Sequence, residues 1–167
     1  AERGILFKNS EALELASKLD TVVLDKTGTI TVGKPAVVDV VYLDGNFTNE
    51  NEFLRLAASA ERGSEHPLGR AIVAEATRRG LTLSEPASFK AARGLGMSAT
   101  VDGRQVLAGK PGWFIEMGLD LGPLAHELSS LQNQGKTVMV IAVDKQIAGL
   151  VAVADRVKPD SKDAIES

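Results

Sequence analysis

The chain has 167 residues, enough for one domain or two small ones. Hydrophobic residues make up 44% of it and aromatic residues only 4%, so it can bury a core that should be mainly aliphatic. A net charge of −3 without any basic block argues against nucleic acid as a partner. The absence of cysteine excludes disulfides and thiolate metal sites from this stretch, and no apolar run approaches the ~20 residues of a membrane helix.

Both ends of the sequence look like cuts through secondary structure. Residues 4–7 begin in mid-element without an initiating Met, and residues 163–167 look like the first turns of an uncapped helix. No signal peptide is visible, because residues 1–10 are mixed and charged. We therefore expect an excised piece of a longer protein.

The first predicted elements surround an acidic turn. Ser10 can cap a helix that runs to about Leu19. The short, β-branched apolar run Thr21–Leu24 predicts a buried strand, and the acidic turn at residues 25–29 follows it directly. The sequence Gly33-Lys34-Pro35 then breaks the pattern and predicts a linker.

The middle of the chain predicts two helices followed by hairpins. A strand at residues 37–43 precedes a helix that begins at Thr48 or Asn49 and ends near Gly63, and a second helix runs from Pro67 to Arg79. The two-residue turn signal Asp102-Gly103 predicts one hairpin, and Asp144-Lys145-Gln146 between two apolar strands predicts a second. The remaining predicted elements are strands at 89–91, 97–101 and 104–108, helices at 113–117 and 121–134, and strands at 138–143 and 147–153.

Hairpins beside helices indicate an α+β fold, which differs from the opening helix–strand unit. The simplest organisation is an insertion. Residues 1–34 and 155–167 then belong to one domain, and residues 35–154 form a second domain between them.

The acidic turn is suited to phosphate chemistry. A strand would hold the Asp25 carboxylate in place, and Gly28 would allow a tight turn. Successive N–H groups, Lys26 and the Thr27 hydroxyl can then face an anion, and a carboxylate so held can attack phosphorus to form an aspartyl-phosphate. The plainer alternative is a strand that ends in an acidic turn.

Two further groups are candidates for a binding site. Glu61 and His66 lie on either side of a helix–helix turn, where a carboxylate can accept from an exocyclic amine and an imidazole can contact a base. The alternative is a turn in which His66 only caps a helix. For His126, within the leucine-rich helix, we expect a surface or half-buried residue without function.

The glycine-rich turn at Gly94-Leu95-Gly96 is a weaker signal, because it lacks the third glycine and the parallel strand of a dinucleotide fingerprint. It is either a bulge that opens a hairpin or a place where backbone approaches a flat ligand. Lys110 is either a phosphate contact or a solvated loop lysine. Trp113 is either core or lid, and the sequence decides neither case.

Together these residues resemble the heavy-metal-transporting P-type ATPases. Residues 25–31 are similar to the family's phosphorylation motif, and residues 64–68 to its Ser-Glu-His-Pro motif. The weaker matches are the glycine loop at 93–96 with Asp102-Gly103, the membrane-exit segment at 4–9 and the hinge motif at 155–158. Residues 8–14 resemble the copper pumps more than the zinc pumps.

The resemblance implies a fold and site roles. It implies a nucleotide-binding domain of antiparallel sheet and helices inserted into a partial haloacid-dehalogenase-like α/β phosphorylation domain. Asp25 would receive the γ-phosphate of ATP, Lys26 and Thr27 would hold phosphate oxygens, and Asp25 and Thr27 would contact Mg²⁺. The residues expected to line the adenine pocket are Glu61, His66, Gly94 and Gly96, and Lys110 is carried only as a candidate contact.

The resemblance also implies partners and a location. In the parent protein, ATP hydrolysis would drive a heavy-metal ion across a membrane, with this segment on the cytoplasmic side next to transmembrane and actuator domains of the same chain. The family's Mg²⁺-binding Gly-Asp-Gly-x-Asn-Asp segment and its phosphate-contacting lysine would follow residue 167. Lys110 departs from the family, which usually has Asn there.

Three alternatives stay open. The chain by itself is an ATP- or ADP-binding module without turnover, or its parent pumps zinc or cadmium, or the protein is a phosphatase of the haloacid dehalogenase type. Such phosphatases place a second acid two residues after the nucleophile, where this chain has Thr27. The lack of that acid favours a long-lived acyl-phosphate and hence a pump.

Overall fold

The computed structural model describes residues 9–45 and 47–166, and within them the strands form one six-stranded antiparallel sheet. Its order is β1-β6-β5-β4-β3-β2, so β1 and β2 are the edges. The strands are β1 Thr31–Tyr42, β2 Ser88–Ala92, β3 Gly96–Val101, β4 Arg104–Gly109, β5 Thr137–Val143 and β6 Gln146–Val157. The helices are α1 Ser10–Ala16, α2 Glu50–Ala60, α3 Pro67–Arg78, α4 Pro111–Glu116, α5 Ala125–Asn133 and α6 Ser161–Glu166, with short turns η1 Lys26–Ile30, η2 Glu61–Gly63 and η3 Gly122–Leu124.

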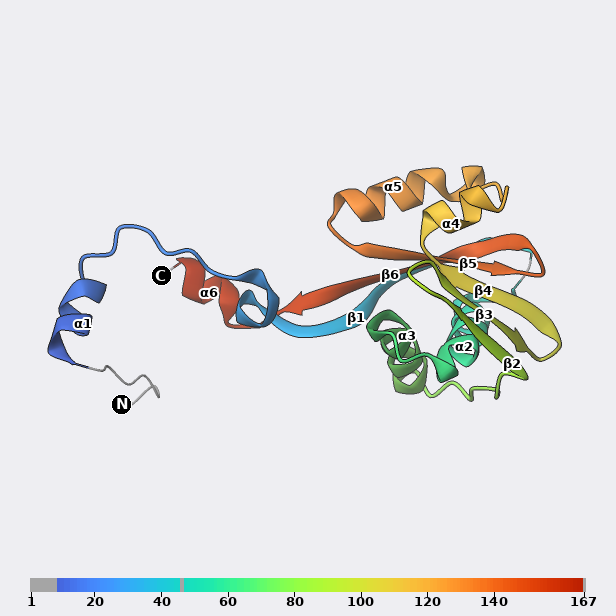
Figure 1. Cartoon of the computed structure of the whole chain (residues 1–167), viewed down its shortest axis with the longest axis horizontal. Helices are drawn as coiled ribbons and strands as arrows, with labels where there is room; N and C mark the ends of the chain where they lie inside the picture. Colours follow the sequence, from blue (N-terminus) through green and yellow to red (C-terminus); the bar gives the residue numbers. More distant parts are fainter. Residues whose placement is uncertain (1–8, 46, 167) are drawn as a thin grey trace.

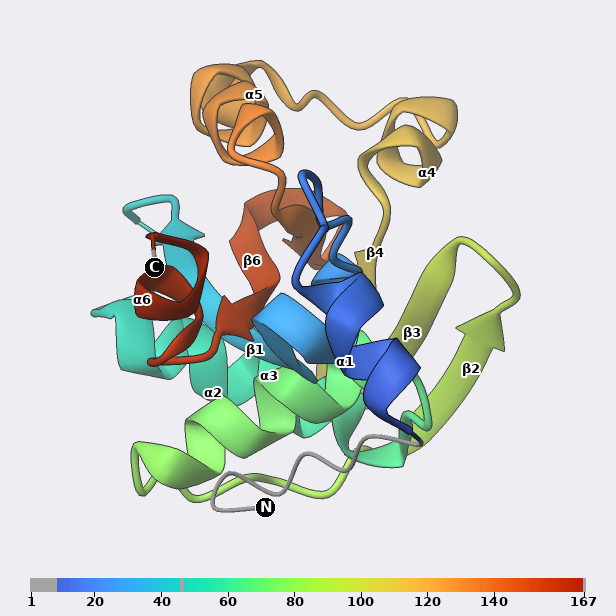
Figure 2. The same cartoon turned by 90° about the vertical axis from the view of Figure 1, so that its left-hand side faces the viewer.

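Helices cover both faces of the sheet (Figures 1 and 2). Helices α2 and α3 pack on one face around the fully buried Phe53 and Ile72. Helices α4 and α5 pack on the other around Phe114 and Leu124. Strands β5 and β6 are buried on both sides, which explains their near-continuous apolar sequences. The expected α+β fold of antiparallel sheet and flanking helices is confirmed.

Local signals set most element boundaries. The Asn49 side chain caps α2 by accepting from the Glu52 N–H at 3.0 Å. The turn of the β3–β4 hairpin has positive φ at Asp102 and Gly103, 49° and 78°, and the β5–β6 turn has the same property at residues 144 and 145. Both are two-residue turns whose twist matches that of paired strands, so the two predicted hairpins are confirmed.

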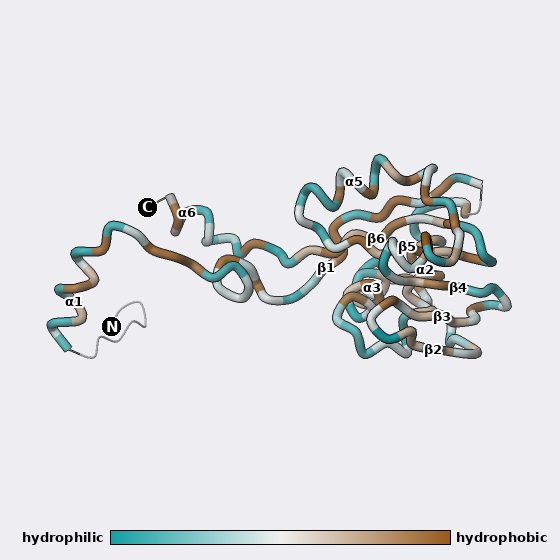
Figure 3. Tube along the Cα trace, turned by 45° about the horizontal axis from the view of Figure 1, so that its top comes forward, coloured by the Kyte–Doolittle hydropathy of each residue, from teal (hydrophilic) through white to brown (hydrophobic). Residues whose placement is uncertain are grey.

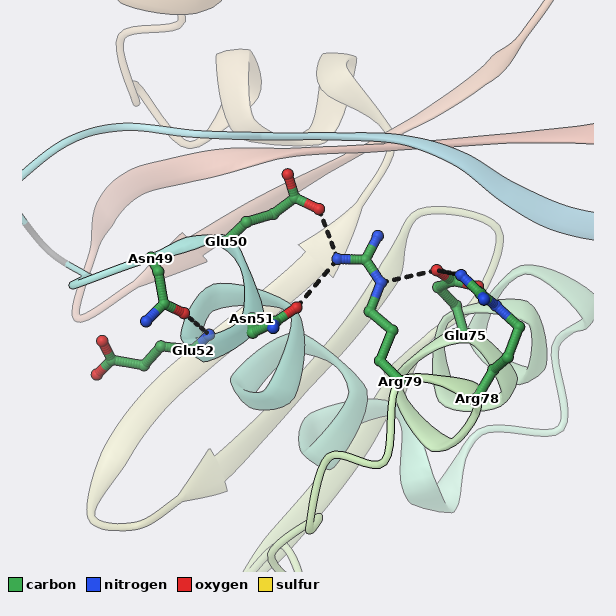
Figure 4. A network of polar contacts seen from close by, with 7 residues as sticks. All are labelled: Asn49, Glu50, Asn51, Glu52, Glu75, Arg78 and Arg79. Atoms are coloured by element: carbon green, nitrogen blue, oxygen red, sulfur yellow. Dashed lines mark hydrogen bonds and ion pairs between the residues drawn. The ribbon is translucent and has the colours of Figure 1, made fainter.

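An ionic network fastens the end of α3 to the start of α2 (Figure 4). Arg79 forms ion pairs with Glu50 at 2.6 Å and with Glu75 at 2.7 Å, and Arg78 forms a second ion pair with Glu75 at 2.7 Å. Glu75 is buried, and its hydrogen bonds from Arg78 and Arg79 lower its pKa to about 2. The network therefore stabilises the helix pair through a carboxylate that stays ionised.

The predicted buried strand Thr21–Leu24 is wrong. These residues adopt no regular structure, and Val23 is 92% exposed. Figure 3 shows this apolar run outside the body of the molecule, between α1 and η1. A strand needs neighbours for its backbone hydrogen bonds, and no strand of the described residues pairs with it. The preceding helix ends at Ala16 rather than near Leu19.

The predicted linker Gly33-Lys34-Pro35 is also wrong, because it lies within β1. Gly33 has φ of 76°, and the pairing of β1 with β6 shifts register between Thr31 and Pro35, so the break is a bulge in an edge strand. The proposed boundaries at residues 34/35 and 154/155 both fall within this strand pair and stay predictions.

Two expectations from the sequence concern membranes. The membrane-exit resemblance at residues 4–9 lies, apart from Asn9, outside the described residues. None of the helices in the described part of the chain has the length and apolarity needed to cross a membrane.

Candidate functional site

A cavity of about 540 Å³ lies where the α2–α3 turn meets the β2–β3 turn and the start of α4. Five residues expected to contact a nucleotide line it together: Glu61, His66, Gly94, Gly96 and Lys110. They come from three separate stretches of sequence. Apolar side chains, among them Leu68, Phe89 and Met139, form much of the remaining wall. Such volume and lining are typical of sites for small organic ligands.

Glu61 is the buried acid of the cavity. It lies in η2 directly after α2 and is only 2% exposed. Burial raises the pKa of Glu61, and a side-chain hydrogen bond with Ser64 opposes that rise. A partly desolvated carboxyl group is a strong acceptor for a ligand N–H, since no positively charged side chain among the described residues pairs with Glu61.

Gly69, in the first turn of α3, makes room for this carboxyl group. A Cβ atom at position 69 would lie 2.3 Å from Glu61 Oε2 and 2.7 Å from Ser64 Oγ. Both distances are far below van der Waals contact. Only glycine at position 69 therefore lets Glu61 occupy its buried position beside the cavity.

His66 caps α3 and lines the cavity at once. Its Nδ1 atom accepts from the Leu68 N–H at 3.2 Å, and Pro67 occupies the first helical position. Because Nδ1 is an acceptor, the ring proton of the neutral imidazole is on Nε2. The capping role and the ligand role, which the sequence presents as alternatives, are thus compatible: Nε2–H stays available to a ligand.

Glycines form the opposite wall. Gly94 has φ of 76°, a conformation that L side chains rarely adopt, and nothing lies within 4 Å of where its Cβ would be. Gly96 pairs with Gly109 across β3 and β4. The Lys110 N–H donates to the Leu95 carbonyl at 2.9 Å, which joins the two segments. The exposed Lys110 side chain lies at the rim.

The acidic turn lies apart from this cavity, beyond the end of the β1–β6 strand pair (Figure 1). Asp25, Lys26 and Thr27 are all exposed, and the Asp25 carboxylate has no hydrogen-bond partner among the described residues. Gly28 has φ of 79°, as its predicted role in a tight turn requires. Asp25 is therefore accessible to solvent and is not held by a strand.

The end of β6 and the residue that follows it hold this turn and the start of β1. The Asp155 carboxylate accepts from the Thr31 hydroxyl and from the N–H groups of Gly33 and Lys34, the latter at 2.9 and 3.1 Å. The Lys158 ammonium donates to the Gly28 carbonyl at 2.8 Å. The hinge motif identified by resemblance thus connects the acidic turn to the sheet.

The donor set near Asp25 limits which metal can bind. The described residues contain no group of three or more His, Cys, Asp or Glu side chains arranged to hold a metal ion. The Asp25 carboxylate and the Thr27 carbonyl offer hard oxygen ligands. They fit Mg²⁺, which usually keeps several waters and takes one or two carboxylates plus substrate phosphates.

A second cavity, of about 520 Å³, lies beside the edge strand β1. Asp39, Arg79, His126 and Glu127 are among its lining residues. Asp39 pairs with Lys136 at 2.6 Å, and Arg79 belongs to the α2–α3 network. Two of its charged groups, Asp39 and Arg79, are thus already engaged in ion pairs. His126 is exposed, as expected from the sequence.

Sequence reasoning missed several residues of the first cavity. Gly69 carried a usable signal, because a glycine inside a helix costs about 1 kcal/mol relative to alanine and needs a reason. Phe89 and Met139 carried none, since each looks like an ordinary core residue of a strand. Only the tertiary structure shows that they line the cavity.

Comparison with known proteins places this geometry in a family. The family model of the haloacid dehalogenase-like hydrolases matches residues 19–167. The chain belongs to that family. Among curated relatives, the copper-transporting P-type ATPase of Rhizobium leguminosarum bv. viciae is 44% identical over 167 residues, which are all of this chain and 20% of that protein.

Solved structures agree. A zinc-transporting PIB-type ATPase in the E2.Pi state is 35% identical with a TM-score of 0.76, over 84% of this chain and 22% of that one. The N-domain of HMA8, a copper-transporting P-type ATPase, is 30% identical with a TM-score of 0.60, over 71% of this chain and 99% of that one. The resemblance to heavy-metal P-type ATPases is therefore confirmed, and the chain spans about a fifth of the curated relative's length.

Proposed function

We propose that this chain is the ATP-binding and phosphorylation-site portion of a metal-transporting P-type ATPase. The observation that supports the proposal most is that one cavity brings together the five residues expected to contact a nucleotide: Glu61, His66, Gly94, Gly96 and Lys110. Copper is the favoured cargo, since curated relatives that are 44% identical over nearly the whole chain are copper-transporting or copper-exporting P-type ATPases. The cargo ion would bind in a membrane part of the parent, beside transmembrane and actuator domains, with this segment on the cytoplasmic side.

The cavity would take the adenosine part of ATP or ADP. The Glu61 carboxyl group would accept from the exocyclic amine, and the His66 Nε2–H would donate to the base or ribose. Gly94 and Gly96 would let backbone lie against the flat ring. Lys110 would attract the phosphates where they leave the cavity.

Asp25 would act as the nucleophile. Its carboxylate oxygen bonds to the γ-phosphorus as the bond from that phosphorus to the β,γ-bridging oxygen breaks, which gives an aspartyl-phosphate and ADP. The Lys26 ammonium and the N–H groups of the turn would hold the phosphate oxygens. Mg²⁺, when bound through Asp25, the Thr27 carbonyl and the phosphates, neutralises charge that develops on the transferred group.

The β1–β6 strand pair would connect the site of nucleotide binding with the site of phosphate transfer to Asp25. The cavity lies in the sheet-and-helix body, whereas the segment with the acidic turn at residues 25–29 lies beyond the far end of this pair (Figure 1). The nucleotide must therefore be carried onto Asp25 by a closing motion. The Asp155 contacts to β1 mark where such bending would occur.

Calorimetry and a phosphate-release assay on the 167-residue chain test the proposal. ATP and ADP should each bind at one site, without steady phosphate release. His66→Gln should weaken binding, and the matched control His126→Gln should not. Steady release that Asp25→Asn abolishes would contradict the view that the chain alone only binds. Wild-type affinity in His66→Gln would remove the adenine assignment.

A further inference from the structure

The chain's single tryptophan lies against the glycine wall of the cavity. A Cβ atom at Gly96 would lie 2.9 Å from Trp113 Cζ3, and one at Gly109 would lie 2.7 Å from Trp113 Cε3. These two ring atoms are bonded neighbours, and the two glycines are partners across β3 and β4. One edge of the indole therefore covers both α-carbons.

The indole supports the wall from outside the cavity. Gly96 and Gly109 line the cavity, whereas Trp113 does not. Trp113 packs with the cluster on the α4–α5 face, where its ring meets that of the fully buried Phe114 edge-on at 5.5 Å. Met97, the next residue along β3 from Gly96, packs on the opposite face of the sheet. The glycine pair is thus the thin layer between Trp113 and a ligand.

Backbone hydrogen bonds make the same connection. The Lys110 N–H donates to the Leu95 carbonyl at 2.9 Å, and the Trp113 N–H donates to the Lys110 carbonyl at 3.1 Å. The β2–β3 turn, the end of β4 and the first turn of α4 are therefore linked in series. A change in the height of α4 would move the glycine turn with it.

We propose that Trp113 is a positioning residue for nucleotide binding: it sets the height of the Gly94–Gly96 turn and of Gly109 through contact with the two glycines. This inference rests on the proposed function for its ligand, an adenine nucleotide. Glycine provides close approach but no rigidity, since it loses more conformational freedom on ordering than other residues. The indole provides that rigidity. Nucleotide binding should in turn alter the ring's surroundings and its fluorescence.

The test compares Trp113→Ala and Trp113→Phe with the wild-type chain. Calorimetry should show ADP affinity weakened about ten-fold in Trp113→Ala, equivalent to about 1.4 kcal/mol, and retained within about three-fold in Trp113→Phe. Leu128→Ala is the matched control, because Leu128 is buried in the same cluster but does not line the cavity. It should lower the melting temperature and leave affinity unchanged. ADP should change the emission of the wild-type chain.

Hydrogen exchange without nucleotide separates this inference from the proposed function. The Lys110 amide, bonded to Leu95, should exchange faster in Trp113→Ala than in the wild type and in Leu128→Ala. Unchanged exchange, wild-type affinity in Trp113→Ala, or an equal loss of affinity in Leu128→Ala would overturn the positioning role. Failure of the wild-type chain to bind ADP would contradict the proposed function, and the exchange rates would still decide the role of Trp113.

Discussion

Gly69→Ala tests how the cavity is built, because one methyl group meets the buried acid directly. The new Cβ would lie 2.3 Å from Glu61 Oε2, more than 1 Å inside ordinary contact, and 2.9 Å from its Cδ. The neighbouring atom is the end of a side chain, so the structure has one ready response. The Glu61 carboxyl group would move away from its position against α3.

Two stability effects oppose each other in this variant. Alanine favours a helix over glycine by about 0.5–1 kcal/mol, while overpacking a buried site costs about 1–3 kcal/mol. We therefore expect a net loss of stability of roughly 1 kcal/mol. ADP affinity should respond more clearly, because the displaced Glu61 carboxyl group would lose its hydrogen bond to the ligand. A hydrogen bond to a charged group contributes about 1.5–3 kcal/mol, so the dissociation constant for ADP should rise roughly ten- to hundred-fold.

Gly112→Ala is the matched control for Gly69→Ala. Gly112 also lies in the first turn of a helix, α4, and its Cβ would meet nothing within 4 Å. This control should keep wild-type affinity and gain up to about 1 kcal/mol of stability. Calorimetry with ADP and urea unfolding measure both quantities. ADP affinity in Gly69→Ala equal to that of the wild type would refute the reasoning.

Three further outcomes follow from the contacts described. The pKa of Glu75 is about 2 in the folded chain against 4.5 in the unfolded chain, so its ionised form contributes up to about 3 kcal/mol of stability that is present above pH 4.5 and lost as pH falls toward 2. The free energy of unfolding, measured with urea, should therefore vary less with pH between pH 5 and pH 3 in Glu75→Gln than in the wild type. An unchanged pH dependence would contradict this. Burial raises the pKa of Glu61, so the buried carboxyl group lowers stability at pH 7, and this cost disappears below pH 4.5. Glu61→Gln should raise the melting temperature at pH 7 yet weaken ADP binding, and a parallel loss of both would argue for a purely structural acid. Asp155→Asn should speed hydrogen exchange at the Gly33 and Lys34 amides without altering ADP affinity, and unchanged exchange would show that the carboxylate does not hold β1.

Elements with local signals were predictable from the sequence. The Asp102-Gly103 pair requires positive φ and produced the expected hairpin, and Pro67 began a helix as expected. The expected nucleotide residues also meet around one cavity, although they come from three separate stretches of sequence. What they bind stays a prediction.

The errors arise where an element depends on distant residues. The apolar run Thr21–Leu24 has the composition of a strand, but composition does not supply a hydrogen-bonding neighbour. The sequence Gly33-Lys34-Pro35 carries every local mark of a linker. It stays in β1 because the Asp155 carboxylate, more than 120 residues later, accepts from its N–H groups.

The contacts of Gly69 and Trp113 were hidden for a related reason. Each contacts its partners through the tertiary fold, Gly69 with Glu61 and Trp113 with Gly96 and Gly109. No spacing in the sequence predicts which glycine faces which side chain. The sequence marks Gly69 as an unusual helix residue, but its contact with Glu61, like that of Trp113 with the two glycines, follows only from distances in the folded chain.

The central claim is that nucleotide binds between the α2–α3 turn and the glycine turn, and amide chemical shifts during an ADP titration test it most directly. The two cavities have similar volumes, about 540 and 520 Å³, so volume alone does not show which of them binds ADP. Amide shifts are assigned to single residues and therefore distinguish the two. The account predicts saturable shifts at His66, Gly94 and Gly96, with residues 126–131 unmoved. Shifts confined to residues 126–131 beside β1, or no saturable shifts at all, would contradict it.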